Sequence, residues 1–270
     1  LSSLVIFLLL GMIRLSPNRF WLWGFLVLSG VQLLLIILYP ILIAPLFNRF
    51  VPIEDKTLAQ KIEALMESAA IPIQGIFQMD AGKRSAHTNA YFTGLGKTKR
   101  IVLYDTLIQR HPPEEILAVL AHEAGHFKKR HVWKQFLALE AGLLLFFYLA
   151  FRILDWPLLY TSFGFQAPKV YAGLLILGFF ARKIGFFLLL FPMALSRHFE
   201  SQADAFAVTV MGRAEPMIAV LKRLAADNLS NLIPHPLYVR FHYSHPSLPD
   251  RVAHLKRISR KRREAKMDCR

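Results

Sequence analysis

Long apolar stretches alternate with polar segments along this chain. The apolar stretches cover residues 1–13, 21–47, 136–154 and 171–195. Since a helix of about 20 apolar residues crosses the hydrocarbon core of a bilayer, each of the last three is predicted to span a membrane. Pro40 and Pro45 are expected to kink or end the second stretch where it leaves the bilayer. The first stretch is short and begins at the first residue, so we expect a truncated span with further membrane segments upstream.

The polar segment at residues 48–135 shows both helical and strand periodicity. On one face of a predicted helix lie Leu58, Ile62, Leu65 and Met66. Strand patterns, with a turn at residues 94–96, cover residues 75–79, 87–93 and 101–104. Pro112 and the acidic residues after it start a further helix. We expect that helix to run on into the third apolar stretch.

Composition supports the membrane prediction and limits the possible partners. Hydrophobic residues make up 54% of the chain and the mean hydropathy is +0.38, which is unusual for a soluble domain. The net charge of +15 comes from basic segments that flank the apolar stretches, as the positive-inside rule describes. The bilayer, and not nucleic acid, is therefore the expected partner. The connection at residues 155–169 is poor in basic residues, so we expect it to face away from the cytoplasm.

Two basic residues lie within the fourth apolar stretch. A charge costs free energy in lipid, so Arg182 and Lys183 are expected to face a watery interior or a carboxylate such as Glu140. A functional site, a buried ion pair and a break in the span all remain open.

A metal-binding pattern lies in the polar segment, at His122-Glu123-Ala124-Gly125-His126. The histidines are four residues apart, so on a helix both imidazoles project from one face and can bind one tetrahedral ion. Glu123 lies on the same turn, where it can take the proton of an attacking water and pass it to a leaving amine. Cys269 is the single cysteine, so the ligands must be His, Asp or Glu. The pattern predicts one zinc ion per chain.

A third protein ligand is expected, because a catalytic zinc site has three and leaves one position open. Glu200 is the best candidate, and Asp204, one helical turn later, can accept the outer N–H of a ligand histidine. Two predicted spans separate His126 from Glu200, and an even number of crossings returns the chain to the same side. The alternative is a solvated acidic pair. We take His131 as a basic-flank residue and His198 as a supporting or structural one.

These patterns together predict a mainly α, integral membrane protein with several spans and a small α+β, zincin-like catalytic insertion. The predicted parts are N-terminal membrane segments (1–47), a catalytic α/β segment (48–135), a membrane hairpin (136–195) and a C-terminal helical part of the catalytic domain with a basic tail (196–270).

Beyond the metal pattern, the chain resembles the M48 membrane metalloproteases, and within them the type I CAAX prenyl protease branch. The matching stretches are spread over nearly the whole chain, at residues 43–48, 83–92, 99–107, 122–126, 199–206 and 242–246. The resemblance implies that zinc is bound by His122, His126 and Glu200. It also implies that Glu123 is the general acid and base, and that Asp204 supports the ligands.

The same resemblance implies contacts with a substrate outside the metal site. Asn89 would hold the substrate backbone, in agreement with an edge strand that pairs with an extended peptide. His245 would stabilise the tetrahedral oxyanion, and Arg251 would be a nearby structural or substrate-binding cation. Without the family, Asn89 is a strand-end or turn residue and His245 a loop histidine. Asp250 stands where the family has glutamate.

The expected function is that of a zinc endopeptidase at the cytoplasmic side of a membrane, either the bacterial inner membrane or the endoplasmic reticulum. If the resemblance extends to the substrate, the protein removes the C-terminal tripeptide of prenylated proteins or cleaves related membrane-associated peptides. The alternatives are a quality-control protease of the HtpX kind, an intramembrane protease of the site-2 type, and a non-catalytic scaffold with a structural metal. Residues 89–92 and 243–246 favour the first. Glu123 argues against the scaffold, which has no need of that carboxylate.

Overall fold

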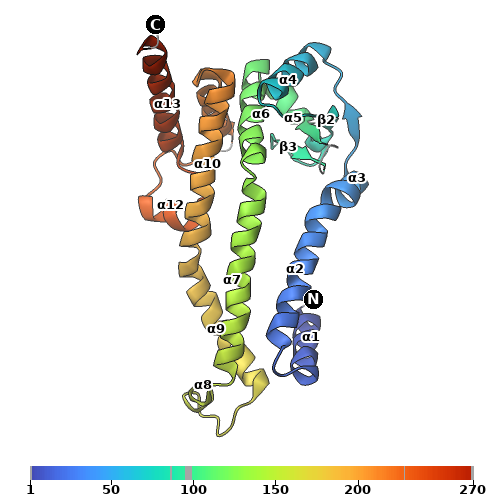
Figure 1. Cartoon of the computed structure of the whole chain (residues 1–270), viewed down its shortest axis with the longest axis vertical. Helices are drawn as coiled ribbons and strands as arrows, with labels where there is room; N and C mark the ends of the chain where they lie inside the picture. Colours follow the sequence, from blue (N-terminus) through green and yellow to red (C-terminus); the bar gives the residue numbers. More distant parts are fainter. Residues whose placement is uncertain (1, 86, 95–98, 228, 269–270) are drawn as a thin grey trace. The chain divides into compact units, whose positions relative to one another are not determined.

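The computed structural model (Figure 1) describes residues 2–85, 87–94, 99–227 and 229–268. The chain divides into two compact units, and each is built from two separate parts of the sequence. One unit comprises Leu1–Ile37 and Lys134–Pro192, and the other comprises Leu38–Trp133 and Met193–Arg270. All the predicted site residues belong to the second unit.

A four-stranded mixed sheet lies in the second unit. Its strands are β1 (Phe50–Pro52), β2 (Gly75–Met79), β3 (Ala90–Thr93) and β4 (Arg100–Tyr104), in the order β1-β2-β4-β3. The β2 and β4 strands are parallel, and the other two pairs are antiparallel. Most of the predicted turn at residues 94–96 lies outside the described residues. Within the described chain β3 pairs with β4 alone, so its other edge can accept an added strand.

The helix α4 (Lys56–Ser68) covers this sheet. Asp55 caps it, since a side-chain oxygen of Asp55 accepts a hydrogen bond of 2.9 Å from the Leu58 amide. Its predicted apolar face is confirmed in the core, although Leu65 is only partly buried. The core joins α4 and β4 to α6 (Pro113–Lys128) through Ile62, Ile101, Leu103, Ile116, Leu117 and Leu120, among others. This packing holds the helix that carries the metal pattern.

The predicted continuous helix from α6 into the third apolar stretch is wrong. The α6 helix ends at Lys128, and α7 (His131–Leu154) begins after a two-residue break. Arg130 has a φ of 56°, and a residue in the left-handed region cannot continue a right-handed helix. The break turns the start of α7 so that the His131 ring lies beside His126.

The C-terminal part of the second unit is helical, as predicted. It contains α10 (Leu190–Met211), α11 (Glu215–Asp227), α12 (Pro236–His242) and α13 (Leu248–Asp268). The short α12 is not predicted by the sequence patterns. A second core joins α6, α10, α11 and α13 through Ala118, Val208, Val220, Leu221 and Leu255. The α10 and α13 helices are therefore anchored to α6, which bears the two histidines.

The first unit consists of apolar helices. It contains α1 (Ser2–Leu15), most of α2 (Phe20–Leu38), most of α7, the short α8 (Pro157–Thr161) and α9 (Val170–Leu188). Three described helical stretches are long and apolar enough to cross a membrane, namely Phe20–Leu38, His131–Leu154 and Val170–Met211. Beyond Leu38 the chain forms a turn of π-helix (Tyr39–Ile43) and then α3 (Ala44–Phe47), so the helix changes form where Pro40 lies.

Glu140 of α7 faces α2 within the first unit. Ser29 donates a hydrogen bond to one Glu140 oxygen, and the Gln32 amide donates to the other at 3.3 Å. The described contacts of Glu140 thus go to neutral side chains of α2, and they do not include Arg182 or Lys183. Both basic side chains are exposed, and the Lys183 ammonium lies 6.0 Å from the ring centre of Phe179.

Candidate metal centre

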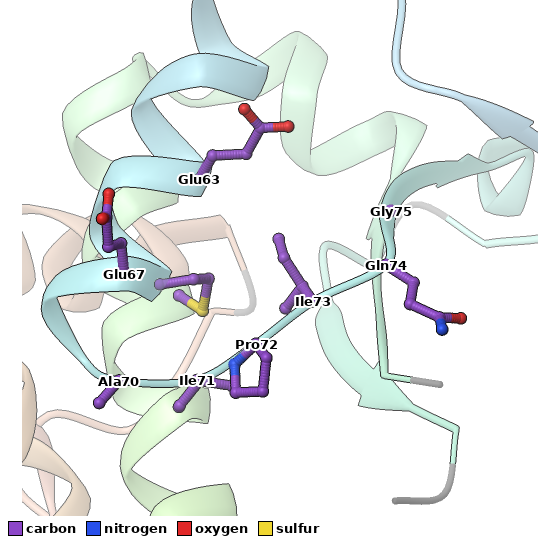
Figure 2. A pocket seen from close by; sticks show the side chains of 9 residues that line it. Glu63, Glu67, Ala70, Ile71, Pro72, Ile73, Gln74 and Gly75 are labelled. Carbon is purple, nitrogen blue, oxygen red and sulfur yellow. The ribbon is translucent and has the colours of Figure 1, made fainter. Parts of the chain in front are cut away.

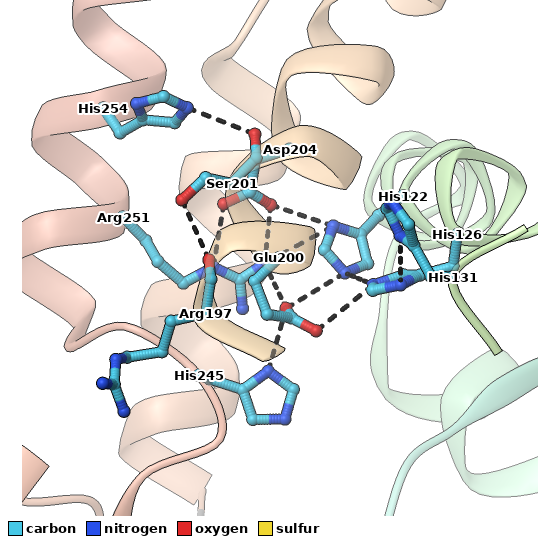
Figure 3. A network of polar contacts seen from close by, with 10 residues as sticks. All are labelled: His122, His126, His131, Arg197, Glu200, Ser201, Asp204, His245, Arg251 and His254. Carbon is cyan, nitrogen blue, oxygen red and sulfur yellow. Dashed lines mark hydrogen bonds and ion pairs between the residues drawn. The ribbon is translucent and has the colours of Figure 1, made fainter. Parts of the chain in front are cut away.

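Three side chains from two helices, those of His122, His126 and Glu200, converge on one another in the second unit (Figure 3). The Nε2 atoms of His122 and His126 lie 3.1 Å apart on α6. Glu200 of α10 places one oxygen 3.3 Å from His122 Nε2 and the other 3.2 Å from His126 Nε2. One ligand atom from each residue lies within 4.8 Å of the others. The structure therefore brings together the three residues that the sequence singled out for metal binding.

Gly125 allows the two helices to approach this closely. A Cβ atom at this position would lie 2.9 Å from Ala203 Cα and 3.0 Å from Phe206 Cβ, both on α10. Such contacts are too short for any side chain, so only glycine fits at this crossing. The close approach places Glu200 opposite the two histidines.

Asp204 contacts the Nδ1 atom of His122, on the side of the ring away from Glu200, and Arg251 in turn contacts Asp204. Asp204 Oδ1 lies 2.9 Å from His122 Nδ1, and the Arg251 guanidinium donates to both Asp204 oxygens, at 2.6 and 2.9 Å. Asp204 is 1% exposed and Arg251 9%. An acceptor at Nδ1 keeps the proton on that atom and leaves the lone pair of His122 Nε2 directed at Glu200. Arg251 was predicted to have either a structural or a substrate-binding role. The structural role is favoured, because its guanidinium donates hydrogen bonds to both oxygens of Asp204.

The donor set fits a cation. Burial disfavours the imidazolium form of His122, but its interactions with the Asp204 and Glu200 carboxylates outweigh burial and raise its pKa to about 9. Glu200 Oε2 is buried and forms no hydrogen bond, although the His122 and His245 nitrogens approach it at ion-pair distances of 3.3 and 2.8 Å. Buried carboxylates need a positive partner. Two imidazoles and a carboxylate form a donor set that suits zinc.

Glu123 follows His122 on α6 and is half-buried. Burial raises its pKa above the usual glutamate range, while the charges of His122 and His126 act in the opposite direction. A carboxylate with a raised pKa is a better proton acceptor near neutral pH. It lies beside the His-His-Glu cluster, where the sequence placed the general base.

The other predicted residues lie farther from the cluster or at its edge. The His245 ring is 60% exposed, and its Nδ1 lies 2.8 Å from Glu200 Oε2. Asn89 is exposed just before β3, and its side-chain oxygen accepts a hydrogen bond of 2.8 Å from the Ala90 amide. No described contact joins Asn89 to the metal cluster, so its role with a substrate stays a prediction.

Two residues were not expected at the site. His131 was taken as a basic-flank residue, yet its ring contacts His126, and Gln202 of α10 contacts the far side of that ring. No periodicity in the sequence indicates this, because the contact depends on the break between α6 and α7. Gln202 is the second unexpected residue. Its four-residue spacing from His198 could have indicated their contact, since this spacing places both side chains on one face of α10.

A separate hollow lies between the end of α4 and the segment that leads into β2 (Figure 2). It is lined by Glu63, Met66, Glu67, Ala70, Ile71, Pro72, Ile73, Gln74 and Gly75. It shares no residue with the His-His-Glu cluster, and its only ionisable lining groups are two carboxylates. This hollow is therefore distinct from the cluster carried by α6 and α10.

The fold and the site together define an integral membrane protein, mainly helical, with a metallopeptidase-type centre on a small mixed α/β unit. Comparison with known proteins identifies the family. Residues 52–259 match the model of peptidase family M48, and residues 1–49 match the model described as the CAAX prenyl protease N-terminal region of five membrane helices. The chain belongs to peptidase family M48.

Individual relatives agree with this assignment. The chain is 41% identical over 236 residues to the CAAX prenyl protease 1 homolog of Oryza sativa subsp. japonica, which covers 87% of this chain and 55% of that protein. It is 38% identical over 276 residues to CAAX prenyl protease 1 of Saccharomyces cerevisiae, which covers 96% of this chain and 60% of that protein. The crystal structure of Ste24p from S. mikatae superposes with a TM-score of 0.82 at 33% identity, over 94% of this chain and 63% of that one. The chain thus spans between half and two thirds of the length of these relatives.

Proposed function

We propose that this chain is the catalytic part of a zinc metalloendopeptidase that removes the C-terminal tripeptide from prenylated proteins at the cytoplasmic side of a membrane. The observation that carries the proposal is the convergence of His122, His126 and Glu200 within 4.8 Å of one another, beside Glu123. The names of the relatives support the CAAX substrate class. The sparse basic residues of the 155–169 connection support a cytoplasmic catalytic side.

Each residue has a task in this reaction. Zinc held by His122, His126 and Glu200 would supply Lewis acidity toward the scissile carbonyl and an attacking water. Glu123 takes the proton of that water and then donates it to the leaving amine. Its raised pKa suits both steps, because the group must accept a proton and afterwards release it.

Substrate contacts come from residues around the cluster. An extended peptide would add to the open edge of β3, and Asn89, just before that strand, would hold its backbone. His245 is exposed and reaches the cluster, so it can donate a hydrogen bond to the oxyanion once the substrate is bound. Arg251 acts indirectly, because it orients Asp204, and Asp204 orients His122.

The test compares cleavage of a prenylated CAAX peptide with that of the same peptide lacking the prenyl group, using the chain reconstituted in lipid vesicles with zinc. Glu123→Gln is expected to retain zinc and to lower the cleavage rate by about 100- to 10,000-fold, the usual contribution of a general base. Glu114→Gln is the matched control, because Glu114 is an exposed carboxylate on the same helix that pairs with Arg213.

The outcomes separate the competing functions. Full activity in Glu123→Gln would show that another group is the base. Equal cleavage of both peptides would favour the quality-control protease. Zinc binding without cleavage of either peptide, in the wild type and both variants, would favour the non-catalytic scaffold.

A further inference from the structure

The second ligand histidine, His126, has a partner that no part of the proposed reaction uses. His131 Nδ1 lies 3.0 Å from His126 Nδ1, on the side of the His126 ring opposite to Glu200. The His131 ring is 1% exposed, and it stacks on Phe199 with 4.3 Å between ring centres and 7° between ring planes. Phe199 directly precedes Glu200, so the same turn of α10 carries both the candidate ligand and the ring on which His131 stacks.

Gln202 determines where the His131 proton lies. Its side-chain oxygen is 3.1 Å from His131 Nε2, and its amide nitrogen is 2.7 Å from His198 Nε2. An amide oxygen can only accept a hydrogen bond, so His131 Nε2 carries the proton. A neutral imidazole has one such proton, and His131 Nδ1 is therefore an acceptor.

The same reasoning extends to the ligand. Because His131 Nδ1 accepts, His126 Nδ1 must donate, and the lone pair of His126 is left on Nε2. That atom lies 3.2 Å from Glu200 and 3.1 Å from His122 Nε2, at the centre of the cluster. Asp204 does the same for His122 with a carboxylate. The two ligand rings thus have different supports, one charged and one neutral.

We propose that His131 and Gln202 are positioning residues that set the tautomer and ring orientation of His126 for metal binding. The inference rests on the metal centre of the proposed function and not on its substrate. Outer partners of ligand histidines change metal affinity by about 10- to 100-fold when they are removed, and the same range is expected here. An imidazole in the neutral form adds no charge to the centre, whereas a second carboxylate would add one.

The test measures zinc affinity of the full chain in detergent by competition with a chelator, and the visible absorption of the Co²⁺-substituted protein. His131→Leu fills the volume but has no acceptor, and it is expected to lower zinc affinity by about 10- to 100-fold and to change the Co²⁺ spectrum. His131→Asn places an amide oxygen near the Nδ1 position, and it is expected to restore most of the affinity. Unfolding of the chelator-treated protein separates a loss of packing from a loss of metal binding.

A matched control and a second variant complete the design. His254→Leu removes another histidine beside α10, whose ring contacts the Ser201 carbonyl and not His126, so zinc affinity is expected to stay within about twofold. Gln202→Met removes the acceptor for His131 without changing the buried ring, and it is expected to lower zinc affinity even if His131→Leu does not fold.

Unchanged zinc affinity in Gln202→Met, or equal losses in His131→Leu and His131→Asn, would overturn the inference. Because no peptide is present, failure of the CAAX activity leaves this result readable on its own.

Discussion

Asp204 is the residue that connects the metal centre to the rest of the second unit. One of its oxygens faces His122 Nδ1 at 2.9 Å, and both accept hydrogen bonds from Arg251. The pair is almost fully buried, and a buried carboxylate that loses its cation keeps the cost of desolvation without the gain from the ion pair. The orientation of His122 therefore depends on a residue from α13, 129 positions later in the chain.

Arg251→Met is expected to leave Asp204 uncompensated and to destabilise the unit by about 3–5 kcal/mol, the usual cost of removing one partner of a buried pair. Arg251→Lys keeps the charge but not the two-point contact, and its effect is expected to be smaller. Thermal unfolding of the chelator-treated protein in detergent measures both. If the two variants unfold at the wild-type temperature, Asp204 does not depend on Arg251 as described.

At the scale of elements, the site depends on the crossing of α6 and α10. The α6 helix carries the two candidate ligand histidines and the proposed base, and α10 carries Glu200 and Asp204. His131, which contacts His126, lies at the start of α7. Gly125 sets their separation, since a Cβ there would overlap the backbone of Ala203. A small displacement of either helix would change both distances from Glu200 to the histidines at once.

Gly125→Ala is expected to force the helices apart and to cost about 1–3 kcal/mol, the range for overpacking in a tight core. Zinc affinity is expected to fall with it, because Glu200 moves away from the histidines. Gly142→Ala is the matched control, since a Cβ at Gly142 of α7 meets nothing within 4 Å. Denaturant unfolding and chelator competition give the two readouts, and a Gly125→Ala protein that behaves like Gly142→Ala would refute the argument.

At the scale of the whole molecule, the second unit is assembled from two chain segments with long apolar helices between them. The helices His131–Leu154 and Val170–Met211 are long and apolar enough to cross a membrane, and we predict that two crossings return the candidate ligands His126 and Glu200 to the same side of the bilayer. The same prediction puts the connection near α8 on the opposite side. The reason is that an even number of crossings returns the chain to the side from which it started.

Labelling of single cysteines from the two sides of sealed vesicles tests this topology. In a Cys269→Ser background, Ser68→Cys at the end of α4 and Ser162→Cys after α8 are both exposed positions. A membrane-impermeant thiol reagent is expected to label one of them from outside and the other only after the vesicles are opened. Labelling of both from the same side would exclude two crossings between the ligands.

Local patterns in the sequence were enough to predict much of this protein. The apolar stretches, the amphipathic face of α4 and the start of α6 at its prolines all depend on neighbouring residues, so periodicity and capping signals reveal them. The four-residue spacings of His122 with His126 and of Glu200 with Asp204 depend only on helix geometry. These spacings were enough to predict a metal-binding cluster of His122, His126 and Glu200, and the structure brings these three side chains together.

Other features were decided only by tertiary structure. The contact between His126 and His131 depends on the left-handed Arg130, a residue type that gives no signal for a chain reversal. The pairing of Arg251 with Asp204 and the approach of Ala203 to Gly125 join residues that are distant in sequence. Sequence periodicity reports which face of an element is buried, but the partner of that face is selected by packing of the whole unit. For this reason the candidate ligands and Asp204 could be predicted from the sequence, whereas the contacts of Asp204 with Arg251 and of His126 with His131 could not.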